Sequence, residues 1–239
     1  MSIRNGLYAT LPMDGNNKLD HIDPYLVLEK ISKVWVLSYK TAFEFHSKTN
    51  PLSSKLYFLS PHTVAPFFFQ STYYKRTPAP VRLQKKGQEM FGVVSYKGSG
   101  VDIKVTNLER TLVDMIDRPH LTGSWEQIWR SLESIESCDL NQVVEYVHLL
   151  ENATTAARVG FFLEQHRETL NVRETHLNLL QKLCPRQPHY LMRSKRNGCK
   201  MLSRWNLLVP PEMINRTRIE GLSLSPTDVT EISDDTNRS

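Results

Sequence analysis

The sequence predicts an α+β protein in which a mixed β-sheet is packed by a helical bundle. Residues 51–105 hold short apolar runs that are separated by turn residues such as Pro78, Pro80 and Gly87, which is the pattern of strands. Residues 106–182 instead repeat apolar side chains at helical spacing. The first region is expected to supply the sheet and the second the bundle.

The first fifty residues predict a strand, a linker and two short helices. Leu7–Leu11 have strand character, and a polar stretch rich in Gly and Asn follows them up to residue 22. Asp23 and Pro24 suit the N-cap and first position of a helix. Ser38 is expected to cap a second helix, which runs to His46.

Six strands are predicted in the β-rich region. The continuous run Phe67–Phe69 indicates a strand that is buried on both faces. The expected strands are Lys55–Leu59, Pro66–Thr72, Tyr73–Arg76, Val81–Lys85, Met90–Tyr96 and Val101–Val105.

The helical region is expected to open at Thr106, which stands three residues before Glu109 as in a capping box. Asp139 and Thr154 are the expected N-caps of two later helices. Trp205 is expected to pack in the core at the start of a strand, and residues 216–239 form an acidic tail predicted to be disordered. The predicted helices are 107–117, 125–135, 140–151, 155–167 and 174–183, and strands return at 189–192 and 204–209.

Composition favours a globular protein of the cytoplasm. The 239 residues are 40% hydrophobic and 23% charged, without the run of roughly 20 apolar residues that a membrane helix needs and without a secretory signal. Cys138, Cys184 and Cys199 are too widely spaced for a disulfide framework and are expected to be reduced thiols. We expect no metal and no cofactor, because neither Cys nor His shows metal-ligand spacing.

Two basic blocks suit contact with a polyanion such as DNA. Residues 186–204 and 75–86 carry six and five basic residues and no acidic one. Lysine and arginine neutralise phosphates without reading the base sequence. Two solvated loops are the alternative interpretation. The candidate phosphate-binding residues are Arg193, Lys195, Arg196 and Lys200, followed by Lys75, Arg76, Lys85 and Lys86.

No residue pattern predicts catalysis. Gly98 and Ser99 with Asp102 match part of a nucleotidyltransferase motif, but position 104 is Lys where a second carboxylate would hold Mg²⁺. Asp114 and Asp117 stand three residues apart on one helix, where Arg110 and Arg118 favour ion pairs over acid–base chemistry. The catalytic residues are therefore predicted to be none.

Three segments together resemble the AbiEi family, the antitoxins and transcriptional regulators of type IV toxin–antitoxin systems. The strand-to-helix junction KVTNLERTLVDMIDRP (104–119) resembles the hallmark of the family. RNGLYATLP (4–12) resembles the wing strand of its N-terminal winged helix, and RWNLLVP (204–210) resembles the strand that closes its C-terminal domain. The segments occur in the family's order.

The resemblance implies three parts: a wing-like remnant and linker at 1–22, an antitoxin domain at 23–215, and the tail. Because the wing-like strand begins at Arg4, most of the winged helix is expected to be absent, through loss or through a start codon that lies upstream. The family resemblance implies a non-enzymatic protein that counteracts a nucleotidyltransferase toxin, without a stable complex, and regulates transcription through DNA. The alternatives are a degenerate nucleic-acid enzyme (a transferase or nuclease) or an orphan DNA-binding protein.

Overall fold

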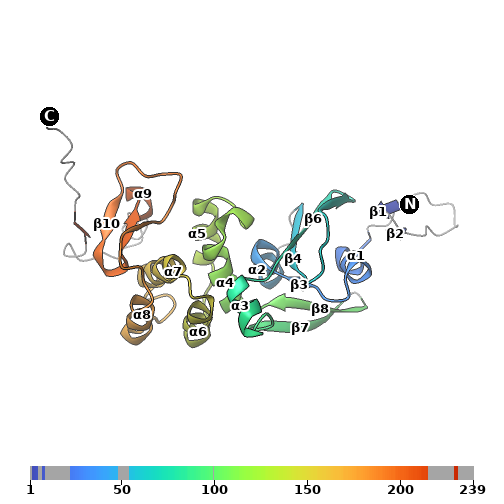
Figure 1. Cartoon of the computed structure of the whole chain (residues 1–239), viewed down its shortest axis with the longest axis horizontal. Coiled ribbons are helices and arrows are strands. Elements are labelled where there is room, and N and C mark those ends of the chain that lie inside the picture. The colour runs from blue at the N-terminus through green and yellow to red at the C-terminus, as the bar shows by residue number, and fades with distance from the viewer. Residues whose placement is uncertain are drawn as a thin grey trace. The chain divides into compact units, whose positions relative to one another are not determined.

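The computed structural model describes residues 22–47, 54–98 and 100–214, together with the backbone of 2–4, 7–8 and 229–230. The chain divides into two compact units, Met1–Thr122 and Gly123–Ser239. Both contain helices and strands (Figure 1), so the predicted α+β class is confirmed. The boundary at Thr122 lies inside the predicted antitoxin domain of 23–215 and divides this range between the two units.

A six-stranded mixed sheet forms the centre of the first unit, in the order β5-β6-β4-β3-β8-β7 (Figure 1). Pairs β4–β6 and β3–β8 are parallel, and the other neighbours are antiparallel. A separate antiparallel pair, β1 (Ser2–Arg4) and β2 (Leu7–Tyr8), lies in the predicted wing-like segment. The sheet strands are β3 (Val36–Leu37), β4 (Lys55–Leu59), β5 (Phe67–Phe69), β6 (Thr72–Thr77), β7 (Val93–Gly98) and β8 (Val101–Thr106).

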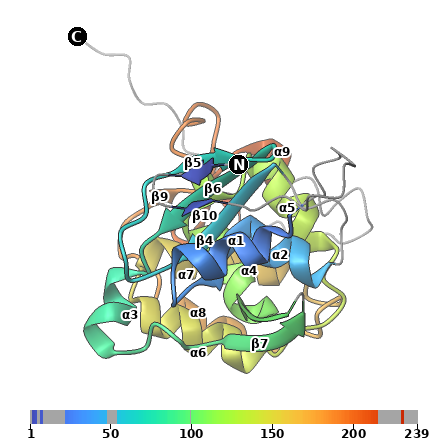
Figure 2. The same ribbon diagram turned by 90° about the vertical axis from the view of Figure 1, so that its right-hand side faces the viewer.

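Helices α1 (Pro24–Ile31) and α2 (Tyr39–His46) pack their apolar sides on this sheet (Figure 2). Val27 and Leu28 of α1 join Leu56 and Phe58 of β4 in one buried cluster. Asp23 caps α1 as predicted, since its carboxylate accepts from the Tyr25 amide. Ser38 stands at the N-cap of α2, but its hydroxyl makes no capping bond there.

The predicted strand Val81–Lys85 is wrong, because these residues form helix α3 (Val81–Lys86). Leu83 is its one buried residue, while Val81 is 62% exposed, so the segment has no buried strand face. Arg, Leu, Gln and Lys favour a helix. Pro80 at the N-cap and Gly87, in the left-handed conformation, delimit it.

Phe67–Phe69 is a strand, as predicted, but is not buried on both faces. Phe69 is 4% exposed and Phe68 is 72% exposed. The run lies in β5, the edge strand, whose alternating side chains point to opposite faces. One face of this edge is therefore open to solvent.

The second unit is mainly helical with a small sheet. Its helices are α5 (Trp125–Glu133), α6 (Leu140–Leu150), α7 (Ala153–Gln165), α8 (Glu174–Gln181) and α9 (Pro211–Ile214). Its sheet has the order β12-β10-β11-β9, formed by β9 (His189–Tyr190), β10 (Lys200–Leu202), β11 (Leu207–Val209) and β12 (Val229–Thr230). Apart from β12, the predicted disordered tail lies outside the described residues.

Two local predictions in this unit change. Asp139 caps α6 as expected, but Asn152 rather than Thr154 caps α7. Trp205 is fully buried, as expected, yet it lies in the 3-10 turn η2 (Ser203–Trp205) that precedes β11. Its indole Nε1 donates to Glu164 Oε2 at 2.5 Å, which holds η2 against α7. Cys138, Cys184 and Cys199 form no disulfide in the described part of the chain.

The junction between β8 and helix α4 (Leu108–Asp117) is held by buried polar contacts. The N-cap is Asn107, whose side chain accepts from the Arg110 amide, so the capping box expected at Thr106 is wrong. Thr106 is engaged elsewhere, because its hydroxyl lies 2.8 Å from the Thr111 hydroxyl in the core. Helix α4 is followed by the short turn η1 (Pro119–Leu121).

Arg110 is fully buried in this junction. Its Nε donates to Asp114 Oδ2 at 3.3 Å, and its Nη1 donates to the carbonyls of Glu89 and Phe91 at 2.7 and 2.6 Å. The same guanidinium therefore binds the carboxylate one turn along α4 and the backbone that leads into β7. A charge removed from water is tolerated when it is paired and hydrogen-bonded in this way.

Replacing Arg110 with Ala should lower the free energy of unfolding by about 3–5 kcal/mol, because it leaves the Asp114 carboxylate buried without this partner. Lys40→Ala is the matched control: Lys40 and Glu44 form an ion pair of the same spacing, 3.5 Å apart, but Lys40 is 44% exposed. That change should cost less than about 1 kcal/mol. Urea unfolding of both variants measures the difference, and equal losses would show that Arg110 is not a structural anchor.

Candidate nucleic-acid interface

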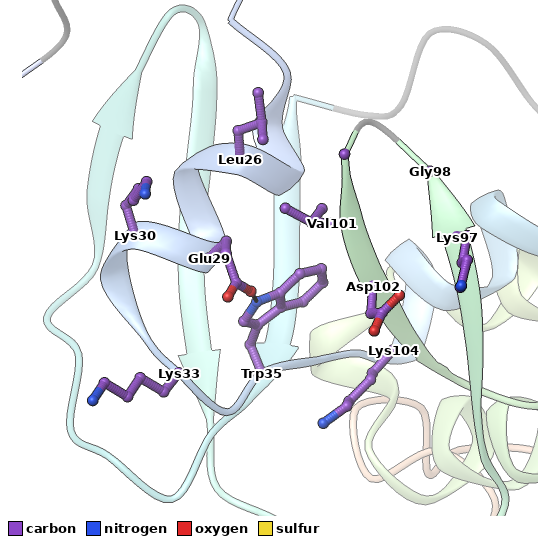
Figure 3. Close-up of a pocket in the computed structure, with 11 residues that line it drawn as sticks. Leu26, Glu29, Lys30, Lys33, Trp35, Lys97, Gly98, Val101, Asp102 and Lys104 are labelled. Carbon is purple, nitrogen blue, oxygen red and sulfur yellow. Dashed lines mark hydrogen bonds between the residues drawn. The ribbon is translucent and has the colours of Figure 1, made fainter.

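A hollow of about 770 Å³ lies in the first unit between α1, the turn that follows it and the β7–β8 hairpin (Figure 3). We call it the lysine hollow, because four lysines line it. Lys30 and Lys33 lie on the α1 side, and Lys97 and Lys104 lie on the hairpin side (Figure 3). Two distant segments of the chain thus bring four positive charges around one hollow.

The α1 wall is held in place by an aromatic anchor. Trp35 is 2% exposed, and its indole Nε1 donates to Glu29 Oε2 at 2.9 Å. The Ser32 hydroxyl donates to the Val34 carbonyl at 2.8 Å, which shapes the turn between α1 and β3. Lys33 stands in this turn, so its position follows from the same contacts.

The hairpin wall follows from the register of β7 and β8. Lys97 is paired with Asp102, and Ser95 is paired with Lys104. Directly paired residues lie on the same face of a sheet, and so do residues two apart on one strand. Lys97, Asp102 and Lys104 therefore share one face of the hairpin.

The lining of the hollow has a positive balance. Four lysines face two carboxylates, Glu29 and Asp102, which leaves a formal charge of two positive units. Glu29 is occupied by the Trp35 indole. Within residues 22–47, 54–98 and 100–214, no carboxylate forms an ion pair with any of the four lysines. Clustered charges of one sign in a hollow attract counter-ions, here anions.

The structure places the first predicted basic block in the loop between β9 and β10. It lines a smaller hollow, of about 360 Å³, with Arg193, Lys195 and Arg196. Lys195 Nζ lies 2.9 Å from Glu212 Oε1 and 3.5 Å from Glu126 Oε1. The bond to Glu212 raises the pKa of Lys195, and the bond to Lys195 lowers the pKa of Glu212. A phosphate at Lys195 would compete with two carboxylates.

Arg196, in the same block, also contacts neighbouring residues. Arg196 Nε donates to the Arg193 carbonyl at 3.2 Å, and its guanidinium lies 5.6 Å from the centre of the Tyr190 ring. Lys200 stands in β10. These contacts orient the block but leave its expected role in phosphate binding a prediction.

The second predicted block is divided between elements. Lys75 and Arg76 are neighbours on β6 and so point to opposite faces of the sheet. Arg76 Nε donates to the Ser60 carbonyl at 2.9 Å, while Lys75 Nζ lies 6.0 Å from the centre of the Tyr57 ring. Lys85 and Lys86 end helix α3. The four residues of this block do not share one face.

The candidate catalytic carboxylates, Asp102, Asp114 and Asp117, lie in different environments. Asp102 lines the lysine hollow, whereas Asp114 is buried against Arg110. Asp117 lies 3.6 Å from Arg118, which confirms the expected ion pairing on α4. Ser99 lies outside the described residues. In the described part of the chain, no three His, Cys, Asp or Glu residues converge as metal ligands, and no helix has the length and apolarity to span a bilayer.

The lysine hollow was missed by sequence reasoning because its cations form no basic run. Lys30 lies in α1, and Lys33 lies in the turn that follows it. Lys97 and Lys104 flank the hairpin turn. Pairing the predicted strands in register would have brought the second pair together, but nothing in the sequence places α1 beside them.

No protein-family model matches the chain, and no curated protein matches it. Among solved structures, the crystal structure of the RV2827C protein from Mycobacterium tuberculosis is distantly similar. The alignment has 14% sequence identity and a TM-score of 0.49, and it covers 79% of this chain and 68% of that one. We draw no functional conclusion from a similarity at this level.

Proposed function

We propose that the chain is a non-enzymatic, cytoplasmic, antitoxin-like regulator that counteracts a nucleotidyltransferase toxin and contacts DNA. Two independent observations support the two parts of this proposal. The resemblance of residues 4–12, 104–119 and 204–210 to the AbiEi family supports the antitoxin part. The lysine hollow supports the DNA part, and it is the single structural observation that carries it.

The lysine hollow suits a phosphate backbone for physical reasons. Its lysines border the hollow on α1, on the turn after α1 and on the β7–β8 hairpin, so several of them can contact phosphates along one strand. Lysine ammonium groups bind phosphates as point charges, and each phosphate neutralised releases counter-ions from DNA. Affinity gained in this way carries no base sequence by itself. The hollow therefore supplies general DNA affinity, on which a regulator's sequence reading would be built.

The DNA part predicts that Lys30→Glu with Lys97→Glu weakens binding of duplex DNA and lowers its salt dependence. Losing two phosphate contacts should reduce the slope of log K against log salt by about two. Arg130→Glu with Lys182→Glu changes the net charge equally at exposed positions of the second unit and should leave the slope nearly unchanged. Fluorescence anisotropy across a salt series measures both.

The same experiment tests whether the first predicted basic block, rather than the lysine hollow, contacts DNA. Lys195→Glu with Arg196→Glu should change the slope less than the hollow variant, because Lys195 already has two carboxylate partners. A larger loss in that variant, with no loss in the hollow variant, would assign DNA contact to residues 193–200 instead.

The antitoxin part predicts a growth phenotype. A reading frame beside this coding region should carry the G-S…D-x-D motif of a nucleotidyltransferase, and its induction should arrest growth unless the present chain is co-expressed. The measurement is colony formation with and without the chain. Arrest that persists on co-expression would contradict the antitoxin role, while leaving DNA binding by the hollow untouched.

A further inference from the structure

Aromatic and basic side chains share one face of the sheet at its β5 edge. Phe68 of β5 is paired with Tyr73 of β6, and Tyr73 is paired in turn with Lys55 of β4. Since paired residues lie on the same face, these three side chains form a row across three strands. Lys75, two residues after Tyr73, lies on that face beside Tyr57. We call Lys55, Phe68, Tyr73 and Lys75 the aromatic–lysine face.

Phe68 is the most exposed large hydrophobic residue among those that the structure describes, at 72%. Its ring contacts the Tyr73 ring with centroids 4.7 Å apart and planes inclined by 43°. Phe67 pairs instead with Tyr74 on the opposite face, where Tyr74 is buried in the core. Phe67 therefore packs against the core, whereas the ring of Phe68 is exposed to solvent.

The two lysines stand within the same small patch. Neighbouring strands are about 4.8 Å apart, and residues two apart on a strand are about 7 Å apart. Lys55 therefore flanks Tyr73 on the side away from Phe68, and Lys75 flanks it along the strand. Strands β4, β5 and β6 lie side by side in Figure 2, as the pairing requires.

Exposed rings beside ammonium groups suit an unpaired nucleic-acid strand. A base stacks on an aromatic ring whatever its identity, and the adjoining phosphates are met by the basic side chains. A duplex does not offer the faces of its bases, because they are stacked within the helix. Two ammonium groups beside the rings favour a ligand that carries negative charge.

We infer that the aromatic–lysine face binds single-stranded DNA or RNA, with a base on Phe68 and phosphates near Lys55 and Lys75. This surface is separate from the lysine hollow in its residues and in its chemistry. It would give the protein a second affinity, for melted or unpaired segments, which the lysines of the hollow alone do not supply. The inference does not depend on the antitoxin role.

The test compares a labelled oligothymidine and oligouridine with a duplex, using fluorescence anisotropy on the full chain. Phe68→Leu keeps an apolar side chain but removes the ring, and it should weaken single-strand binding by about fivefold or more. Phe68→Trp keeps a ring and should retain binding. Duplex binding should be unchanged in both. Val81→Ala, at another exposed apolar position, serves as the control and should behave like the wild type.

Three outcomes would overturn the inference. The first is that the wild type binds neither oligonucleotide. The second is that Phe68→Leu binds single strands as well as the wild type, with circular dichroism showing both folded. The third is that Phe68→Leu changes the sedimentation coefficient of the protein alone without changing oligonucleotide binding, which would make the face a contact between two copies of the chain. Loss of duplex binding on charge reversal in the hollow, with single-strand binding retained, would separate the two surfaces.

Discussion

Arg110 ties the start of α4 to the backbone that leads into the β7–β8 hairpin, and much of the first unit depends on this contact. Its guanidinium donates to the carbonyls of Glu89 and Phe91. The backbone N–H of Asn107 donates to the Gly92 carbonyl at 2.6 Å. Gly92 has a φ of +62°, and a Cβ there would lie 2.7 Å from Asn107 Oδ1. The approach is therefore open to glycine alone without rearrangement.

The contacts of Arg110 also help to position the hairpin wall of the lysine hollow. Both ends of the hairpin are fixed at the α4 junction, so its register and direction are set there. The two strands of the hairpin carry Lys97 and Lys104 to one wall of the hollow. Trp35 and Glu29 hold the other wall. Residues of the motif at 104–119 thus position a charged surface that most of them do not touch.

The fold was predictable where local chemistry decides the structure. Asp23 with Pro24, and Asp139, specify helix starts through their own side chains and φ angles, and both are N-caps in the structure. Other local signals were assigned to the wrong residue or the wrong type of element. Thr106 lost its capping role to a buried contact with Thr111, and residues 81–86 took a helix because of the flanking Pro80 and Gly87.

The candidate site was less predictable than the fold, for a related reason. A run of basic residues can be recognised in the sequence, but its effective charge depends on which carboxylates pack beside it in the fold. Glu126 and Glu212 lie beside Lys195 in this way. The lysines of the hollow come from separate elements, so no run of basic residues in the sequence indicates it. The exposure of Phe68 likewise follows from its place on an edge strand rather than from the apolar run that contains it.

Lysine-acetylation footprinting on the full chain tests the central claim most directly. Each lysine is acetylated with and without duplex DNA, and the modified peptides are quantified by mass spectrometry. DNA is expected to protect Lys30, Lys33, Lys97 and Lys104 together, while Lys195 changes little because a phosphate would compete there with Glu126 and Glu212. Protection confined to Lys195 and Lys200, or no protection at the four lysines under conditions where DNA is bound, would contradict it.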